Sequence, residues 1–117
     1  GVDWVAVPAS GSYQSTVLDL ANWDRALSGD SILNENTRRQ MWTPVALSDG
    51  STSESGLGWG LGPFQKRRRI SHSGGLPGFI SQYWRFPGDR LSIIVLINLD
   101  DADVGTIMAG IARRYLE

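Results

Sequence analysis

The chain contains no cysteine, one lysine and one histidine in 117 residues. The absence of cysteine excludes a disulfide framework and a thiolate metal site, and it leaves both reducing and oxidising compartments open. Any lysine-dependent chemistry within the chain must use Lys66. His72 is the one side chain whose unperturbed pKa lies near neutral pH, so it is the natural proton carrier.

Long apolar runs are also absent, and no stretch reaches the length that crosses a bilayer. The net charge of -1 does not favour nucleic acid or an anionic membrane surface as a partner. Hydrophobic residues make up 41% of the chain and charged residues 20%, which indicates a globular protein. The chain begins with Gly1 and shows no signal peptide. We therefore expect residues 1–117 to form a single segment of a larger domain, preceded by an irregular lead-in over residues 1–12.

Two short helices are predicted in the first half of the chain. Thr16 and Asp19 form a capping pattern for a helix over residues 17–27, and Asp24 falls outside its apolar arc. Asn34 caps a second helix that ends at Trp42, before Pro44. The predicted apolar arc of the first helix consists of Val17, Leu20, Ala21, Trp23 and Leu27.

Strand patterns dominate the second half. Glycines alternate with large apolar residues over residues 56–62, which predicts a strand with tight packing on its glycine face and Trp59 in the core. The glycine spacing does not match a dinucleotide-binding loop. A further strand is expected over residues 67–73, after a turn at 64–66. Residues 79–86 and 91–98 form a predicted antiparallel hairpin.

The second hairpin strand is apolar on both faces, so we expect it to be central and covered on both sides. A final helix capped by Asp103 carries an apolar stripe that can cover one face. The predicted fold class is α+β: an antiparallel sheet of three or four strands, a C-terminal helix packed on it, and two short N-terminal helices that belong to a neighbouring helical region.

Residues 70–78 are the best candidate for chemistry. His72 can carry a proton, and Ser73 supplies a hydroxyl group. Gly74 has no Cβ, and Gly75 offers a flexible backbone amide. On an edge strand the free backbone N–H and C=O groups can pair with an extended amide substrate. A purely structural role for His72 is the alternative.

Other signatures are missing or weak. The chain has no G-x-S-x-G, S-x-x-K or Y-x-N motif, so it carries no complete nucleophilic apparatus. Asp100, Asp101 and Asp103 lack the further ligands of a calcium loop, which favours capping over a metal site. The basic run at residues 66–69 is short, which favours a solvated hairpin over phosphate or nucleic-acid binding. No cofactor is expected.

Four motifs in one order resemble the C-terminal part of the serine beta-lactamase and penicillin-binding-protein-like hydrolases. They lie at residues 15–21, 56–59, 72–79 and 95–98. The resemblance extends from about Pro8 to Leu116 and is nearest to class C beta-lactamases, D-aminopeptidases and beta-lactamase-like esterases. His72-Ser73-Gly74 resembles the third active-site motif of that family.

The resemblance implies a partial beta-lactamase-like fold and acyl-enzyme hydrolysis of an ester, amide or β-lactam. It implies that His72 controls proton traffic, that Ser73 and Gly74 contact substrate, and that the Gly75 amide is an oxyanion-hole donor. The family's S-x-x-K and Y-x-N motifs would lie upstream of Gly1, so the segment alone should be inactive and its exposed sheet should promote self-association. A noncatalytic binding module is the alternative.

Overall fold

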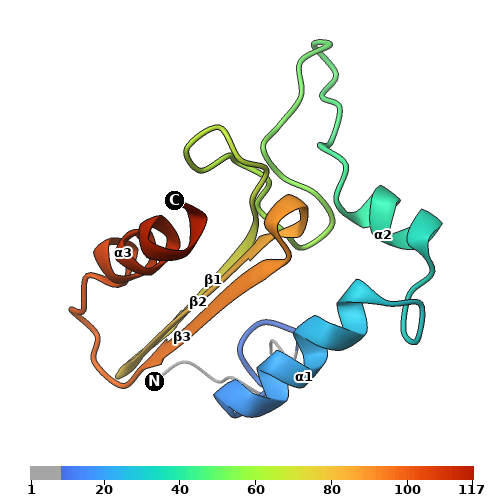
Figure 1. Cartoon of the computed structure of the whole chain (residues 1–117). Coiled ribbons are helices and arrows are strands. Elements are labelled where there is room, and N and C mark those ends of the chain that lie inside the picture. Colours follow the sequence, from blue (N-terminus) through green and yellow to red (C-terminus); the bar gives the residue numbers. More distant parts are fainter. Residues whose placement is uncertain (1–8) are drawn as a thin grey trace.

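The computed structural model describes residues 9–117, and its architecture is α+β (Figure 1). Three α-helices and one three-stranded antiparallel sheet confirm the predicted fold class. The first eight residues of the expected lead-in lie outside the described residues. In chain order the elements are α1 Val17–Ser28, α2 Glu35–Met41, β1 Ile70–Leu76, β2 Phe79–Phe86, the 3₁₀ helix η2 Pro87–Asp89, β3 Leu91–Ile97 and α3 Val104–Leu116.

The strand order is β1-β2-β3, and both pairs are antiparallel. A two-residue turn joins β1 to β2, and its Gly78 has φ +86°, a value that favours glycine. The Asp100 carboxylate accepts a hydrogen bond from the Gly78 amide. We expected the first of these strands over residues 67–73, but it begins three residues later, at Ile70. It continues to Leu76 because the two glycines after Ser73 remain paired with β2.

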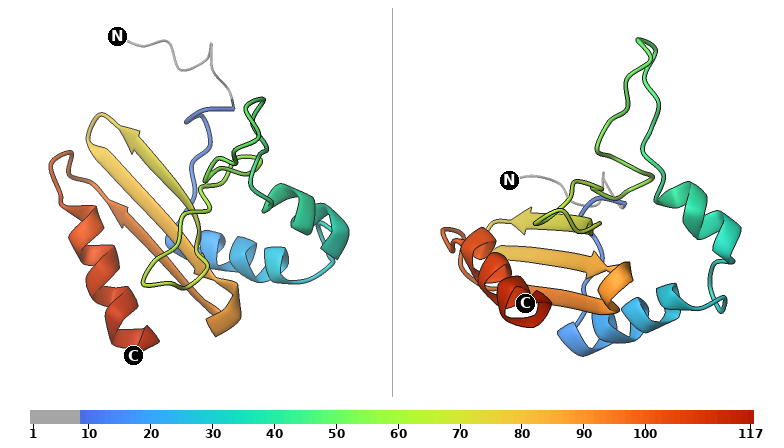
Figure 2. Two further views of the ribbon diagram at one scale, coloured as in Figure 1. Left: turned by 90° about the horizontal axis from the view of Figure 1, so that it is seen from above. Right: turned by 45° about the horizontal axis from the view of Figure 1, so that its top comes forward.

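The position expected for β3 is wrong in one respect. Within the described residues β3 is an edge strand, and β2 is central. The apolar pattern of β3 reflects its two covered faces, since α1 contacts it on one side and α3 on the other (Figures 1 and 2). Two covered faces make a strand apolar whether or not it has a neighbour on each edge.

The main hydrophobic core lies between α3 and the sheet. Asp103 caps α3 by accepting a hydrogen bond from the Thr106 amide at 3.0 Å, as expected. Phe86 and Met108 are fully buried, and each contributes about 1.5–3 kcal/mol through removal from water. The buried core residues are Trp84, Phe86, Ile93, Met108, Ala112 and Leu116.

Helix α1 packs on the opposite face of the sheet, which corrects its assignment to a separate helical region. The caps at Thr16 and Asn34 are as predicted. The predicted apolar arc of α1 is wrong, because Val17 and Trp23 remain more than two-fifths exposed. Leu27 is buried and Asp24 faces the strands, so α1 docks through a face that includes a carboxylate.

Asp24 binds side chains from two strands. Its Oδ1 accepts hydrogen bonds from the Tyr83 hydroxyl and, at 2.6 Å, from the Ser92 hydroxyl. The same oxygen lies 2.8 Å from Arg85 Nε in an ion pair with an almost buried guanidinium. Arg85 Nη2 also donates to Ser28 Oγ at 2.7 Å. A polar network of β2 and β3 side chains therefore anchors α1 to the sheet.

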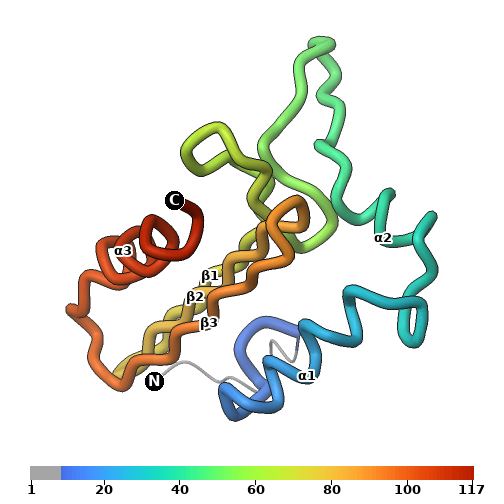
Figure 3. Tube along the Cα trace, viewed as in Figure 1, coloured from blue at the N-terminus to red at the C-terminus, as the bar shows by residue number. Residues whose placement is uncertain are grey.

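The connection from α2 to β1 contains no strand, so the prediction for residues 56–62 is wrong. The chain follows an irregular, looping path there (Figure 3). The segment forms isolated bridges, Ser55 to Gly60 and Gly60 to Ser71. Gly58 has φ +74°, which is incompatible with a continuous strand. The expected tight packing over glycine does occur, because a Cβ at Gly56 would lie 2.3 Å from the Met41 carbonyl oxygen.

Replacing Asp24 by asparagine is expected to destabilise the fold by about 2–4 kcal/mol, because Arg85 would lose its charged partner in a largely buried setting. Urea unfolding measures this change. The control is Asp101→Asn at an exposed position before α3, which should stay within about 0.5 kcal/mol of the original chain. Equal stability of the two variants would contradict an anchoring role for Asp24.

Tyr83 should make the fold sensitive to alkaline pH. Burial, and then its hydrogen bond to Asp24, raise the pKa of the Tyr83 phenol above its usual value. The folded state therefore favours the protonated phenol, and this stabilisation is fully present below about pH 10 and lost as the pH rises further. Phenolate absorbance and circular dichroism, followed together as the pH rises, should show a phenol titration that coincides with unfolding. In Tyr83→Phe this unfolding-linked titration should disappear, and its persistence would refute the assignment.

Candidate active-site cleft

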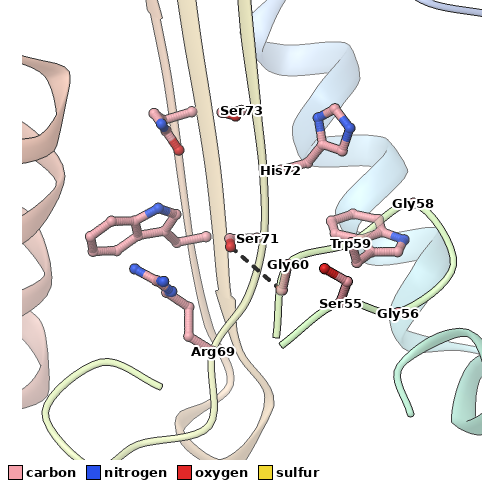
Figure 4. Close-up of a pocket in the computed structure, with 11 residues that line it drawn as sticks. Ser55, Gly56, Gly58, Trp59, Gly60, Arg69, Ser71, His72 and Ser73 are labelled. Atoms are coloured by element: carbon pink, nitrogen blue, oxygen red, sulfur yellow. Dashed lines mark hydrogen bonds between the residues drawn. The ribbon is translucent and has the colours of Figure 1, made fainter. Parts of the chain in front are cut away.

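A cleft of about 500 Å³ lies between β1 and the connecting loop that precedes it (Figure 4). It contains two of the residues selected from the sequence, His72 and Ser73. Gly74 and Gly75 lie farther along β1 and do not line it. The lining residues are Ser55, Gly56, Gly58, Trp59, Gly60, Arg69, Ser71, His72, Ser73, Gln82 and Trp84.

A two-way backbone bridge joins the loop to β1. Gly60 and Ser71 exchange N–H to O hydrogen bonds, both at 2.8 Å. The backbone groups of Ser71 therefore point away from β2. Because backbone directions alternate along a strand, those of Ser73 and Gly75 point to the same outer edge. No described strand pairs with that edge, so a row of amide and carbonyl groups continues beyond the bridge.

His72 lies on the side of β1 that faces Trp59 (Figure 4). The two ring centroids are 6.4 Å apart in an edge-on arrangement. Trp59 also packs edge-on against Tyr83, the residue paired with His72 in the sheet, at 5.5 Å. The Trp59 side chain is half-buried and forms a wall of the cleft, which corrects its assignment to the core. His72 itself remains exposed.

Ser73 belongs to the opposite face of β1, because neighbouring side chains alternate along a strand. Its sheet partner is Gln82. On the same face the Arg69 guanidinium lies 4.5 Å from the centre of the Trp84 ring, and Arg69 Nε donates to the Gly62 carbonyl at 3.1 Å. Partial burial lowers the pKa of the Arg69 guanidinium. The negative charge of Glu54 acts in the opposite direction and raises that pKa. The cleft thus has an aromatic side with an imidazole and a side with an arginine.

The two glycines of the motif have different surroundings. A Cβ at Gly74 would lie 2.4 Å from Ser81 Oγ, so this position packs closely against β2. A Cβ at Gly75 would meet nothing within 4 Å among the described residues. Gly75 therefore combines an outward-facing amide with open space beside it.

The basic run forms the expected hairpin, with Phe64 and Arg67 bridged across the turn, and its arginines also have a structural use. Lys66 occupies the predicted turn, but Arg67 pairs with Asp89 and Arg68 donates to the Trp42 carbonyl at 3.0 Å. Arg69 and Trp59 were not predicted to line the cleft. The only available signal was their place within the basic run and the glycine-rich motif.

Neither a metal centre nor a membrane span emerges from the described residues. No three His, Cys, Asp or Glu residues gather there in a way that could hold a metal ion. None of the helices between residues 9 and 117 combines the length and apolarity that crossing a membrane requires.

The antiparallel sheet, the helix packed on each face and the His-Ser-Gly motif on an edge strand define part of a beta-lactamase-like fold. The chain belongs to the beta-lactamase family, whose family model matches residues 2–115. It is also 32% identical over 96 residues to penicillin-binding protein 4* from Bacillus subtilis (strain 168). That match covers 81% of this chain and 21% of the relative, so the chain spans about a fifth of the relative's length.

The loop wall of the cleft should depend on Gly56. Gly56→Ala is expected to cost about 1–3 kcal/mol, because the new methyl group would collide with a Met41 carbonyl that already accepts from the Leu57 amide at 2.9 Å. Thermal and urea unfolding measure the loss. Gly88→Ala is the matched control, since nothing lies within 4 Å of its added Cβ, and it should change stability by less than about 0.5 kcal/mol. Two equally stable variants would contradict the close packing.

Proposed function

We propose that residues 1–117 are the C-terminal portion of a beta-lactamase-like serine hydrolase that cleaves an ester, amide or β-lactam through an acyl-enzyme. The single observation that carries the proposal is the outer edge of β1. There His72 lines the cleft, and the backbone groups of Ser73 and Gly75 face outward. An extended acyl substrate can pair with such an edge through its own amide groups.

In this proposal the Gly75 amide is one of two oxyanion-hole donors. An N–H group aimed at the carbonyl oxygen stabilises the negative charge of the tetrahedral intermediate, and loss of one donor costs about 100- to 1000-fold in rate. The open space beside Gly75 leaves room for the reacting carbonyl. Gly74 permits the backbone of the substrate to approach the strand.

His72 and Ser73 have distinct proposed roles. The exposed imidazole of His72 exchanges protons with the reacting groups, while Trp59 limits its movement from one side. The Ser73 hydroxyl donates a hydrogen bond to a substrate carbonyl or carboxylate. Because these side chains belong to opposite faces of β1, a substrate at the strand edge can contact both.

The nucleophile must come from residues outside this chain, since the sequence has no S-x-x-K motif. We propose that S-x-x-K and Y-x-N precede Gly1 in a longer protein and that the segment alone is inactive. Exposed apolar side chains on the sheet, including Phe79 and Leu96, are then covered by the rest of that fold or by a second copy.

A fluorescent penicillin or fluorophosphonate should label the longer protein at a serine upstream of Gly1 and leave the segment alone unlabelled. In the labelled protein, His72→Ala is expected to lower the acylation rate by about 100-fold or more, as expected for loss of a general acid or base. Ser73→Ala should mainly raise KM, because it removes a hydrogen bond to the substrate.

The control for these variants is Ser81→Ala on the neighbouring strand, which lies outside the cleft. It should retain the original kinetics. A longer protein that binds these substrates but never labels or turns them over would identify a noncatalytic binding module. Unchanged kinetics in the His72 and Ser73 variants would return both residues to a structural role.

A further inference from the structure

A second cavity, of about 380 Å³, lies on the α1 face of the sheet near the start of β3. It shares no lining residue with the cleft beside β1. Its walls come from α1, the ends of α2 and β2, η2 and β3. The lining residues are Asp24, Leu27, Ser28, Arg38, Trp42, Arg85, Phe86, Pro87, Arg90, Leu91 and Ser92.

Two buried donors in this lining have neither a hydrogen bond nor an ion pair among the described residues. Arg85 is only 6% exposed. Its Nη2 donates to Ser28, its Nε lies in the ion pair with Asp24 without forming a hydrogen bond, and its Nη1 has neither kind of partner. The indole Nε1 of Trp42 is likewise buried and unpaired. Buried donors almost always find an acceptor, so two of them in one cavity point to a ligand that supplies acceptors.

The charge of the lining is positive. Asp24 is already paired with Arg85, and Arg38 lies 2.9 Å from Asp30 Oδ1. Arg90 lies exposed at the rim with φ +51° and forms no ion pair among the described residues. The three arginines therefore outweigh the one carboxylate in the wall, and this excess favours an anion.

The remaining walls are apolar. Leu27 and Phe86 are fully buried, and Leu91 and the Trp42 ring complete this surface. The Arg85 guanidinium lies 5.0 Å from the centre of the Trp42 ring, so the charge and the aromatic surface are adjacent. Guanidinium groups bind carboxylate and phosphate oxygens well, whereas apolar walls favour a carbon body over a bare ion.

We propose that this cavity binds a small organic oxyanion, a carboxylate or phosphate ester with an apolar body. The oxyanion accepts from Arg85 Nη1 and the Trp42 indole N–H, and Arg90 provides a further positive charge at the entrance. The proposal does not rest on the proposed hydrolysis, because none of the residues of this site lines the cleft beside β1.

Titration of the chain with phenyl phosphate and with benzoate, followed by ¹H–¹⁵N NMR at constant ionic strength, tests the proposal. The assigned indole N–H resonance of Trp42 should shift and saturate with a Kd of about 1 mM or tighter for one or both anions. The ratio of their Kd values gives the preferred oxyanion. Benzyl alcohol, which has the same ring without the charge, should not shift that resonance.

Arg90→Gly removes the entrance charge and suits the positive φ of this position. It should raise the Kd by about two- to five-fold, in the range of an exposed charge contact. Arg114→Ala on α3 is the control and should leave the Kd unchanged. Arg85→Gln should abolish binding, provided that its spectrum stays dispersed.

Any one of three results would overturn the proposal. The first is that neither anion shifts the Trp42 resonance, and the second is that benzyl alcohol binds as well as the anions. The third is that Arg114→Ala weakens binding as much as Arg90→Gly. These outcomes do not depend on the folding of the Arg85 variant, so the site can be refuted even if that variant unfolds.

Discussion

The contact between Asp24 and Arg85 holds α1 on the sheet, and the arrangement of both spaces described above depends on that position. The carboxylate of α1 reaches Tyr83 and Arg85 on β2 and Ser92 on β3, which fixes the helix across two strands at once. Taking these charges out of water is costly, and the additional hydroxyl donors offset part of that cost. The fixed position of α1 in turn closes one side of the second cavity and holds Tyr83 against Trp59.

The features that local sequence determines were predicted well. The caps at Thr16, Asn34 and Asp103 each use a side chain that accepts from an amide three residues later, so a short window of sequence contains the whole interaction. The hairpin of β2 and β3 was also predicted, because its turn and both apolar runs are contiguous. These elements were sufficient to assign the α+β class.

The features that were predicted wrongly depend on distant partners. Asp24 looks like a solvent-facing residue until Tyr83, Arg85 and Ser92, about 60 to 70 positions away, are brought to it. Trp59 fits a core strand by pattern, but the positive φ of Gly58 turns the chain and makes Trp59 a cleft wall. His72 and Ser73 could be selected from sequence because both are chemically distinctive. Arg69 could not be distinguished from the two arginines before it.

One layer of aromatic rings separates the cleft from the second cavity. The Arg85 guanidinium lies over Trp42, the Trp42 ring packs edge-on against Trp59 at 6.3 Å, and Trp59 packs against His72 at 6.4 Å. Trp42 lines only the cavity, and Trp59 lines only the cleft. The edge-on contact of Trp42 with Trp59 therefore places the walls of the two spaces against each other. The same glycine-rich loop that carries Trp59 also bridges to Ser71, so the geometry around His72 depends on contacts made on both sides of this aromatic layer.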